Sequence, residues 1–401
     1  MKDIKNESTI LMHYGENKEE YQGAVVPPIY QNSLFTFKDW DDIDRAFDNP
    51  SNNCIYTRGN NPTALIAERK LAKLAGGEKA KLFTSGMAAI SAAIMHCVKQ
   101  NGHIITIKNT YGPANNFMGT YLKEKMNMEV TYISGNTVEE FRENIKENTC
   151  LIYLESPSSV VFSLQDIEGV AKLAREHGIK TIIDNTWATP IFQKPLEMGI
   201  DIEVHSCSKY IGGHSDIVAG VVIGSEKDLT EIFESEHALY GGKIAPFEAW
   251  LITRSLRTLP IRLKQHQENA MKVAKFLENH EKVKKIYYPG LESFDQYELG
   301  KKQMSGYTGL LAMDVDCNDV EKIKKFVNSL ELFYIGVSWG GFESLVYAPA
   351  ISYLKEMSPD KFEAMGITLG SIRISIGLEE VDDLIEDLEQ ALQHLYETFS
   401  K

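Results

Sequence analysis

Two polar residues that end apolar runs carry the chemistry that this sequence suggests. Asp184 ends the run Thr181-Ile182-Ile183. Lys209 lies about 25 residues further on, in Ser206-Cys207-Ser208-Lys209-Tyr210, after the run Ile200–Val204. A lysine can form a Schiff base with an aldehyde, a carboxylate can pair with a protonated ring nitrogen, and hydroxyls can bind phosphate. Together these groups suit pyridoxal 5′-phosphate (PLP), which favours an enzyme over a binding module.

A second polar group comes from the stretch Thr84-Ser85-Gly86-Met87-Ala88, which follows a predicted strand and opens a predicted helix. Free backbone N–H groups at a helix start, with a glycine that allows close approach, form a phosphate site. Ser206 and Ser208 can add hydroxyl donors to the same anion. Tyr111 follows the next strand and can lie flat on a pyridine ring.

Each of these residues also has a plain structural explanation. The glycine motif fits an ordinary strand-to-helix turn, Tyr111 fits core packing, and Asp184 fits a helix cap or an ion pair. Lys209 alone fits a surface lysine, since lysines are rarely buried. The PLP hypothesis gains its weight from the combination, because every separate explanation would have to hold independently.

A lysine that attacks an aldehyde must be neutral, which is rare at the usual pKa. At a pKa near 10.4, only about one lysine in 2,500 is neutral at pH 7. Burial or a nearby cation lowers that pKa. Arg373, in Ser371-Ile372-Arg373-Ile374-Ser375, is a candidate cation, and its planar guanidinium also matches the α-carboxylate of an amino acid. A surface-strand arginine is the competing interpretation.

The pattern of elements predicts a mostly parallel sheet covered by helices on both faces. Apolar strands alternate with helical stretches, as in the segment after Asp166, where Ile167, Val170 and Ala174 share one face. This alternation is typical of α/β folds, whose ligands bind beyond the carboxyl ends of the strands. The predicted strands are Lys81–Phe83, His103–Ile107, Glu129–Ile133, Leu151–Leu154, Thr181–Asp184, Ile202–His205 and Val218–Ile223.

Three regions are predicted in the 401 residues, which exceed the size of one ordinary core. Residues 1–60 are polar and form an extended arm, residues 61–246 form the α/β domain, and residues 247–401 form a smaller α+β domain. A helix is expected to start at Pro62, after the capping residue Asn61. The second domain begins with a long helical segment over roughly Phe247–Asn279. Its predicted strands and closing helix are Gly309–Val315, Leu332–Val337, Ser371–Ile376 and the apolar face of Val381, Leu384, Ile385, Leu388, Leu392 and Leu395.

The bulk properties favour a soluble cytoplasmic protein. The chain is 43% hydrophobic and 24% charged, with a formal net charge of −14, which argues against binding to nucleic acids or anionic membranes. No apolar run is long enough for a signal peptide or a membrane span. The five cysteines form no close pair, and the ten histidines show no metal-binding spacing, so neither disulfides nor metal are expected. Cys207 is expected to be a small buried residue and His214 a structural one.

Five motifs in the expected order make the sequence resemble a known family. The family is the cysteine and methionine metabolism branch of the fold-type I PLP-dependent enzymes, and the resemblance runs from about residue 20 to the C-terminus. The motifs are Tyr56-Thr57-Arg58-Gly59-Asn60-Asn61-Pro62-Thr63, Ser85-Gly86-Met87-Ala88-Ala89, Glu155-Ser156-Pro157, Asp184-Asn185-Thr186-Trp187 and Ser206-Cys207-Ser208-Lys209-Tyr210-Ile211-Gly212-Gly213-His214.

This resemblance implies a role for each candidate residue. Lys209 matches the Schiff-base lysine, Asp184 the partner of the pyridinium nitrogen, and Tyr111 the tyrosine that stacks on the ring. Arg373 matches the arginine that binds the substrate carboxylate, with Ser338 and Trp339 nearby. The remaining cofactor-binding positions are Gly86, Met87, Thr186, Ser206 and Ser208.

The resemblance also implies that two subunits share each active site. Tyr56 and Arg58 match residues that reach into the neighbouring subunit, where they contact its phosphate and, for Tyr56, its substrate. A homodimer is therefore the expected minimum, and the family usually pairs dimers into a homotetramer. This would give the N-terminal arm a surface to lie against.

Within the family, the chain most resembles the bacterial cystathionine β-lyases. Trp339, in the stretch Val337–Leu345, stands where most relatives have leucine. Pro113 replaces the cysteine usual in methionine γ-lyases, and Val337 replaces the glutamate of many cystathionine γ-lyases. Ser158-Ser159-Val160 departs from the usual Ser-Asn-Pro, which leaves the role of that asparagine unassigned. The resemblance implies α,β-elimination of L-cystathionine to homocysteine, pyruvate and ammonia.

Other functions stay open at the level of the sequence. The nearest are γ-elimination and γ-replacement, as performed by cystathionine γ-lyase, methionine γ-lyase and cystathionine γ-synthase, and β-elimination from cysteine. A non-catalytic PLP-binding protein is disfavoured, because the lysine, the aspartate and Arg373 are all present. An α/β protein without a cofactor would be colourless when purified.

Overall fold

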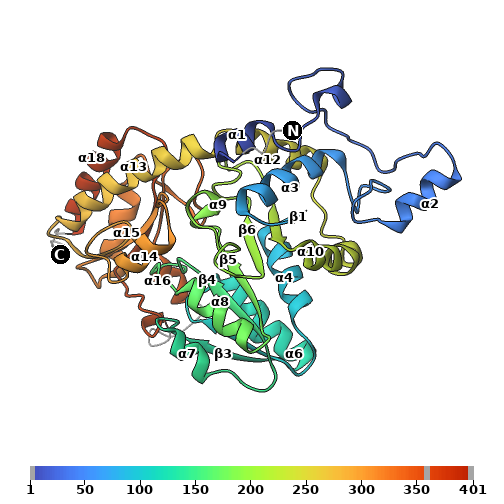
Figure 1. Cartoon of the computed structure of the whole chain (residues 1–401). Helices are drawn as coiled ribbons and strands as arrows, with labels where there is room; N and C mark the ends of the chain where they lie inside the picture. The colour runs from blue at the N-terminus through green and yellow to red at the C-terminus, as the bar shows by residue number, and fades with distance from the viewer. Residues whose placement is uncertain (1–4, 356–361, 396–401) are drawn as a thin grey trace.

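The computed structural model describes residues 5–355 and 362–395, which contain two β-sheets, each packed against helices (Figure 1). The larger sheet lies in the first two thirds of the chain, and the smaller one lies near the C-terminus. The prediction of an α/β architecture with a mostly parallel large sheet is confirmed.

The large sheet has seven strands in the order β1-β7-β6-β5-β4-β2-β3. The strands β2 to β6 run parallel, and β7 is antiparallel to both of its neighbours, β1 and β6. Their carboxyl ends therefore meet at one edge of the sheet. The strands are β1 (Lys79–Phe83), β2 (His103–Ile107), β3 (Glu129–Ile133), β4 (Thr149–Glu155), β5 (Lys180–Asp184), β6 (Ile202–Ser206) and β7 (Gly220–Gly224).

Helices cover both faces of this sheet, because its central strands are apolar on both sides. Ile104 packs into the core beside α4, whereas the adjacent Ile105 packs on the opposite face beside α8. The expected helix start at Pro62 is confirmed, and the Asn61 side chain caps it by accepting from Thr63 N–H. The helices are α3 (Pro62–Ala75), α4 (Gly86–Cys97), α5 (Gly112–Asn116), α6 (Lys123–Met126), α7 (Val138–Glu143), α8 (Ile167–Glu176), α9 (Thr189–Phe192), α10 (Glu226–Ile232), α11 (Ala238–Tyr240) and α12 (Pro246–Leu256).

The second sheet has five strands in the order β10-β11-β12-β9-β8. Its central strand β12 sends Ile372 and Ile374 into a core shared with α13, α15 and α18, and Arg373 lies between them on the other face. The strands are β8 (Val283–Tyr287), β9 (Leu310–Val315), β10 (Tyr334–Ile335), β11 (Leu345–Tyr347) and β12 (Ser371–Ser375). The helices are α13 (Leu259–Glu278), α14 (Tyr297–Gln303), α15 (Val320–Ser329), α16 (Pro349–Tyr353) and α18 (Val381–Leu392).

The N-terminal segment is more structured than the expected extended arm. It contains α1 (Glu7–His13), a 3₁₀ turn over Lys18–Tyr21 and α2 (Trp40–Asp48). Leu11 of α1 is fully buried, and the buried Lys70 of α3 donates to its carbonyl. The start of the segment therefore packs on its own large domain, whereas the part near α2 projects away from it (Figure 1).

The predicted helical segment over roughly Phe247–Asn279 is confirmed as helical but is interrupted once. The chain forms α12 and α13, separated at Arg257 and Thr258. Pro260 lies in the first turn of α13, where its missing N–H is tolerated but where it cannot continue a preceding helix. The expected strand at Leu332–Val337 is only two residues long, and β8 and β11 were not predicted.

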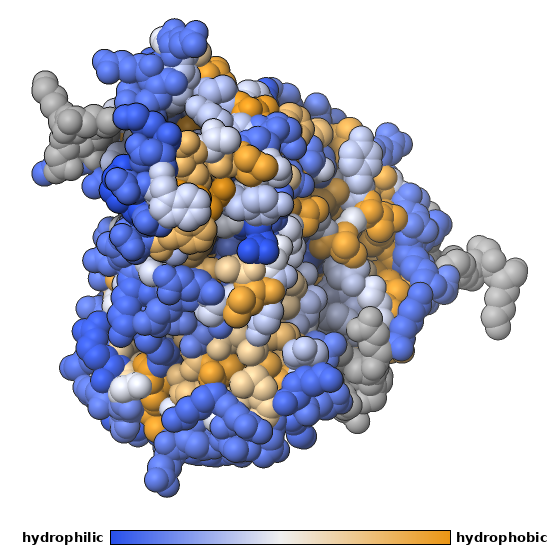
Figure 2. Space-filling model, turned by 90° about the vertical axis from the view of Figure 1, so that its right-hand side faces the viewer, coloured by the Kyte–Doolittle hydropathy of each residue, from blue (hydrophilic) through white to orange (hydrophobic). Residues whose placement is uncertain are grey.

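One face of the molecule exposes apolar side chains. Figure 2 shows one face on which apolar side chains gather in the middle and hydrophilic ones surround them. Among the described helices, none is long and apolar enough to span a lipid bilayer.

A buried hydrogen bond joins the segment after Lys209 to the second domain. The Tyr210 hydroxyl accepts from Gly309 N–H at 2.9 Å, and Tyr210 is 1% exposed. In Tyr210→Phe this N–H loses its partner, which costs about 1–3 kcal/mol. We therefore expect a lower midpoint of thermal unfolding for the variant. Tyr121→Phe, at a 52% exposed position, is the control, and an equal midpoint in both variants would contradict the expectation.

Candidate active site

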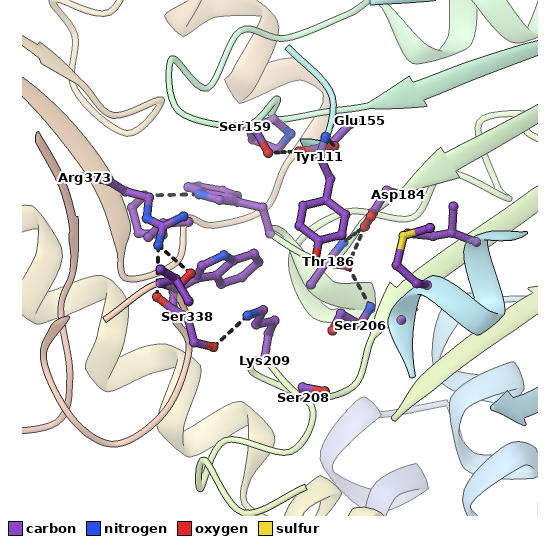
Figure 3. Close-up of a pocket in the computed structure, with 18 of the residues that line it drawn as sticks. Tyr111, Glu155, Ser159, Asp184, Thr186, Ser206, Ser208, Lys209, Ser338 and Arg373 are labelled. Atoms are coloured by element: carbon purple, nitrogen blue, oxygen red, sulfur yellow. Dashed lines mark hydrogen bonds between the residues drawn. The ribbon is translucent and has the colours of Figure 1, made fainter. Parts of the chain in front are cut away.

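A cavity of about 520 Å³ lies at the carboxyl edge of the large sheet, where the second domain covers it. Strand ends β4, β5 and β6 and the start of α4 supply one side, and the segment 337–343 with β12 supplies the other. Figure 3 shows that the labelled side chains from both domains point toward one another across this space. The cavity brings together the predicted residues Gly86, Met87, Tyr111, Asp184, Thr186, Ser206, Ser208, Lys209, Ser338, Trp339 and Arg373.

Lys209 lies in the turn after β6, with its amine inside the cavity. Its Nζ donates to Ser338 Oγ at 2.6 Å and lies 5.3 Å from the centre of the Trp339 ring. Burial and, to a smaller extent, the Arg373 cation lower the pKa of Lys209, Asp184 partly opposes them, and together these effects bring it to about 8. The amine is therefore neutral far more often than that of an ordinary lysine, as Schiff-base chemistry requires.

Asp184 ends β5 and presents a buried carboxylate to the same cavity. Its Oδ1 accepts from the Thr186 N–H at 3.0 Å and from the Thr186 hydroxyl. Burial raises the pKa of Asp184, whereas the Thr186 donors, His205 and Lys209 lower it. No donor from the described residues contacts Oδ2, which leaves this oxygen for the N–H of a protonated ring.

The start of α4 forms a cradle for an anion. Ser85 caps this helix of 12 residues by accepting from Ala88 N–H, so the N–H groups of Gly86 and Met87 remain available. A Cβ on Gly86 would lie 2.9 Å from the Cβ of Ser206, so only glycine allows β6 to approach so closely. The hydroxyl of Ser208 accepts from Ala219 N–H, which fixes its position at the cavity wall.

Arg373 reaches the cavity from β12. It donates to the carbonyl oxygens of Val337 at 2.8 Å and Ser338 at 3.3 Å, and its guanidinium lies 5.1 Å from the centre of the Tyr347 ring. These contacts hold the guanidinium in place and leave it other donors, because arginine has five. Arg373 can therefore bind a carboxylate while it holds the segment that carries Ser338.

Tyr111 lies at the N-terminus of α5 and is 45% exposed. Its backbone N–H donates to Glu155 Oε2 at 2.6 Å, and Ser159 Oγ donates to Glu155 Oε1 at 2.6 Å. Burial raises the pKa of the Tyr111 phenol, with smaller contributions from Asp184 and Glu155, so the phenol is protonated at neutral pH. Glu155 and Ser159 were not among the predicted site residues, although Glu155 directly follows the predicted strand Leu151–Leu154.

Two predicted site residues lie elsewhere in this chain. Tyr56 and Arg58 are exposed and line a second cavity of about 270 Å³ beside Phe233 and Glu234. They are absent from the lining of the cavity that contains Lys209. Their predicted role in the active site of a neighbouring subunit stays a prediction.

Comparison with known proteins identifies the family. A family model described as Cys/Met metabolism PLP-dependent enzyme matches residues 8–393. The chain belongs to this family. It is 40% identical to an L-methionine γ-lyase of Porphyromonas gingivalis over 390 residues, which is 97% of each chain. It is 36% identical to a cystathionine β-lyase of Coxiella burnetii over 385 residues, which is 96% of this chain and 97% of the relative.

A solved structure with the same fold contains the bound cofactor. A protein of Campylobacter jejuni assigned as an O-acetylhomoserine (thiol)-lyase superposes with a TM-score of 0.92 and is 29% identical, and the match covers 97% of this chain and 100% of that one. That structure contains N′-pyridoxyl-lysine-5′-monophosphate. The predictions of PLP as the cofactor and of a PLP-dependent lyase of this family are confirmed. Three features of the cavity fit PLP. The start of α4 can bind its phosphate, and the free oxygen of Asp184 can accept from its ring nitrogen. Lys209 has the lowered pKa that a Schiff base with its aldehyde requires.

The pKa of Lys209 should depend on Arg373. In Arg373→Gln the neighbouring cation is gone, so the pKa of Lys209 should rise from about 8 toward its ordinary value. The lysine then becomes neutral only at higher pH, and the rate at which the apoenzyme captures PLP should reach its midpoint at higher pH. The absorbance of bound PLP after mixing, measured across pH, reports this midpoint.

The matched control is Arg142→Gln, because Arg142 forms exposed ion pairs with Glu139 and Glu176, outside the cavity. Its midpoint should equal that of the unmodified protein. An unchanged or lower midpoint in Arg373→Gln would contradict the inferred influence of the arginine on the lysine.

Proposed function

We propose that the protein is a carbon–sulfur lyase that cleaves L-cystathionine by α,β-elimination and releases homocysteine, pyruvate and ammonia. The observation that carries this proposal is the position of Lys209, whose buried amine lies in one cavity with Asp184 and Arg373. This arrangement can bind an amino acid by its carboxylate and remove its Cα proton. Val337 and Trp339 form an apolar wall beside the lysine, which suits the thioether part of the substrate.

PLP, when bound, supplies an electron sink for the charge that develops at Cα. Arg373 binds the α-carboxylate, which fixes the orientation of the substrate. Lys209 Nζ takes the Cα proton, which its lowered pKa favours. The free oxygen of Asp184 holds the ring nitrogen in its protonated state.

Cleavage of the bond between Cβ and sulfur needs a proton for the leaving thiolate. Lys209, protonated by the first step, and the Tyr111 phenol are the groups of the cavity that can supply it. A positioned general acid contributes about 10² to 10⁴-fold to such a step. Homocysteine leaves as the thiol, and hydrolysis of the remaining three-carbon unit yields pyruvate and ammonia.

The decisive experiment identifies the products that the purified, PLP-loaded protein forms from L-cystathionine. Pyruvate with homocysteine is the expected result. Lys209→Ala should form neither product and should lack the visible absorbance of covalently bound PLP, because the amine is gone. If that variant retained both properties, Lys209 could not have the proposed role.

The second candidate function is γ-elimination, and the 40% identity to an L-methionine γ-lyase favours it. This reaction requires a further proton abstraction at Cβ of the substrate. It would produce 2-oxobutyrate with cysteine from L-cystathionine, and 2-oxobutyrate with methanethiol from L-methionine. Either result would replace the β-elimination proposal and leave the role of Lys209 intact.

We further propose that a second copy of the chain completes each active site. Tyr56 and Arg58 are exposed and lie outside the Lys209 cavity, and large apolar side chains are exposed on the same N-terminal segment and near α11 and α12. Such residues suit an interface between subunits. They include Val25, Leu34, Trp40, Phe47, Leu239, Tyr240 and Phe247.

Mixed oligomers test this sharing of sites. Arg58→Ala and Lys209→Ala should each be nearly inactive, but coexpression of the two should restore roughly one quarter of the activity, since half of the dimers then contain one intact site. The comparison is the activity of the two variants mixed after separate purification. If coexpression restored nothing while mixed dimers formed, the sites would not be shared.

A further inference from the structure

Two carboxyl groups lie side by side at the edge of the large sheet, and the proposed chemistry uses only one of them. Glu155 ends β4 and Asp184 ends β5, and the parallel register pairs these two residues directly. Residues paired in this way send their side chains to the same face of the sheet. Glu155 therefore lines the same cavity as Asp184, next to the group that holds the ring nitrogen.

Glu155 joins two loops that approach the cofactor site from different strands. Its Oε2 accepts from the backbone N–H of Tyr111, in the loop after β2, and its Oε1 accepts from the hydroxyl of Ser159, in the loop after β4. A third hydrogen bond, from Ser159 N–H to the Asn109 carbonyl at 2.9 Å, ties the same two loops. We call the two contacts made by the Glu155 carboxyl group the Glu155 bridge (Figure 3).

The bridge restrains the position of Tyr111, whose side chain has few other restraints. Tyr111 is 45% exposed, its side chain does not cap α5, and its backbone differs from that of the helix that follows. The hydrogen bond from its N–H is the contact that sets the position of the residue relative to β4. A change in this contact would shift the phenol ring across the mouth of the cavity.

We propose that Glu155 is a positioning residue, which holds Tyr111 in place for its contact with the PLP ring through the Glu155 bridge. Glu155 itself needs no contact with the substrate for this role. The inference rests on the cofactor alone and holds for β-elimination and γ-elimination alike.

The neighbouring carboxylate determines which form of Glu155 performs this task. Burial and then Asp184 raise the pKa of Glu155 to about 8, so its carboxyl group is largely neutral at pH 7. Asp184 can then carry the negative charge that the protonated ring nitrogen requires. In this neutral form the carboxyl O–H can donate to Ser159 Oγ, which reverses the direction of that contact. Glutamine is a close copy, because it keeps an oxygen for the Tyr111 N–H and its NH₂ group donates to Ser159 Oγ.

The experiment compares Glu155→Ala with Glu155→Gln in two measurements that do not depend on turnover. The first is visible circular dichroism of bound PLP, which reports the asymmetric surroundings of the ring. The second is the affinity of the apoenzyme for 4′-deoxypyridoxine 5′-phosphate, which has no aldehyde and so binds without Lys209. Glu155→Ala should weaken this affinity about 5- to 10-fold and reduce the dichroism, since the bridge is lost. Glu155→Gln should stay within about 2-fold of the unmodified protein.

Glu140 offers a matched control. It forms a similar bridge outside the cavity, where it accepts from the N–H and the hydroxyl of Ser134. Glu140→Ala should lower thermal stability without changing either cofactor measurement. Unchanged measurements in Glu155→Ala would overturn the proposal. Loss in Glu155→Gln equal to that in Glu155→Ala would also overturn it, because the charge and not the bridge would then be the essential feature.

Discussion

Burial of the Lys209 amine is the constraint on which the rest of the cavity depends. A charged ammonium loses its hydration when it is enclosed, and burial is accordingly the largest cause of its lowered pKa. The second domain provides this enclosure, since Ser338, Trp339 and Arg373 cover the amine from one side. The same domain supplies the nearby cation. A lysine of the large domain is thus activated by residues that lie more than 120 positions further along the chain.

Close backbone contact makes this enclosure possible. Gly340 has a φ of +80°, and a Cβ at this position would lie 2.8 Å from the backbone nitrogen of Tyr210. Only glycine therefore lets the segment with Ser338 and Trp339 pass over the turn that carries Lys209. Buried Arg262 of α13 supports the turn by donating to the Tyr210 carbonyl at 2.8 Å. The lysine turn is held by both domains, which fixes the amine between the two halves of the cavity.

The sequence was sufficient to predict the elements whose signals are local. The strands of the large sheet are apolar runs with polar residues at their ends, and this pattern located Asp184 and Lys209. It did not reveal the role of Glu155, because the contact with Tyr111 joins positions 44 residues apart and depends on strand register. Strand β8 was not predicted, because the two consecutive exposed lysines Lys284 and Lys285 interrupt its short apolar pattern. The break between α12 and α13 was missed because apolar residues continue on both sides of it.

The structure of the cavity distinguishes β-elimination from γ-elimination poorly, because both reactions begin with the same steps. The roles proposed for Arg373 in carboxylate binding, for Lys209 in proton removal and for Asp184 in charge pairing would be common to both, so the residues with the clearest geometry cannot distinguish them. The difference must arise where the substrate side chain extends, which is near Val337 and Trp339. Val337 is 73% exposed in the single chain, so a neighbouring subunit can complete this wall. Specificity would then be a property of the assembled oligomer, while the proton-transfer groups belong to one chain.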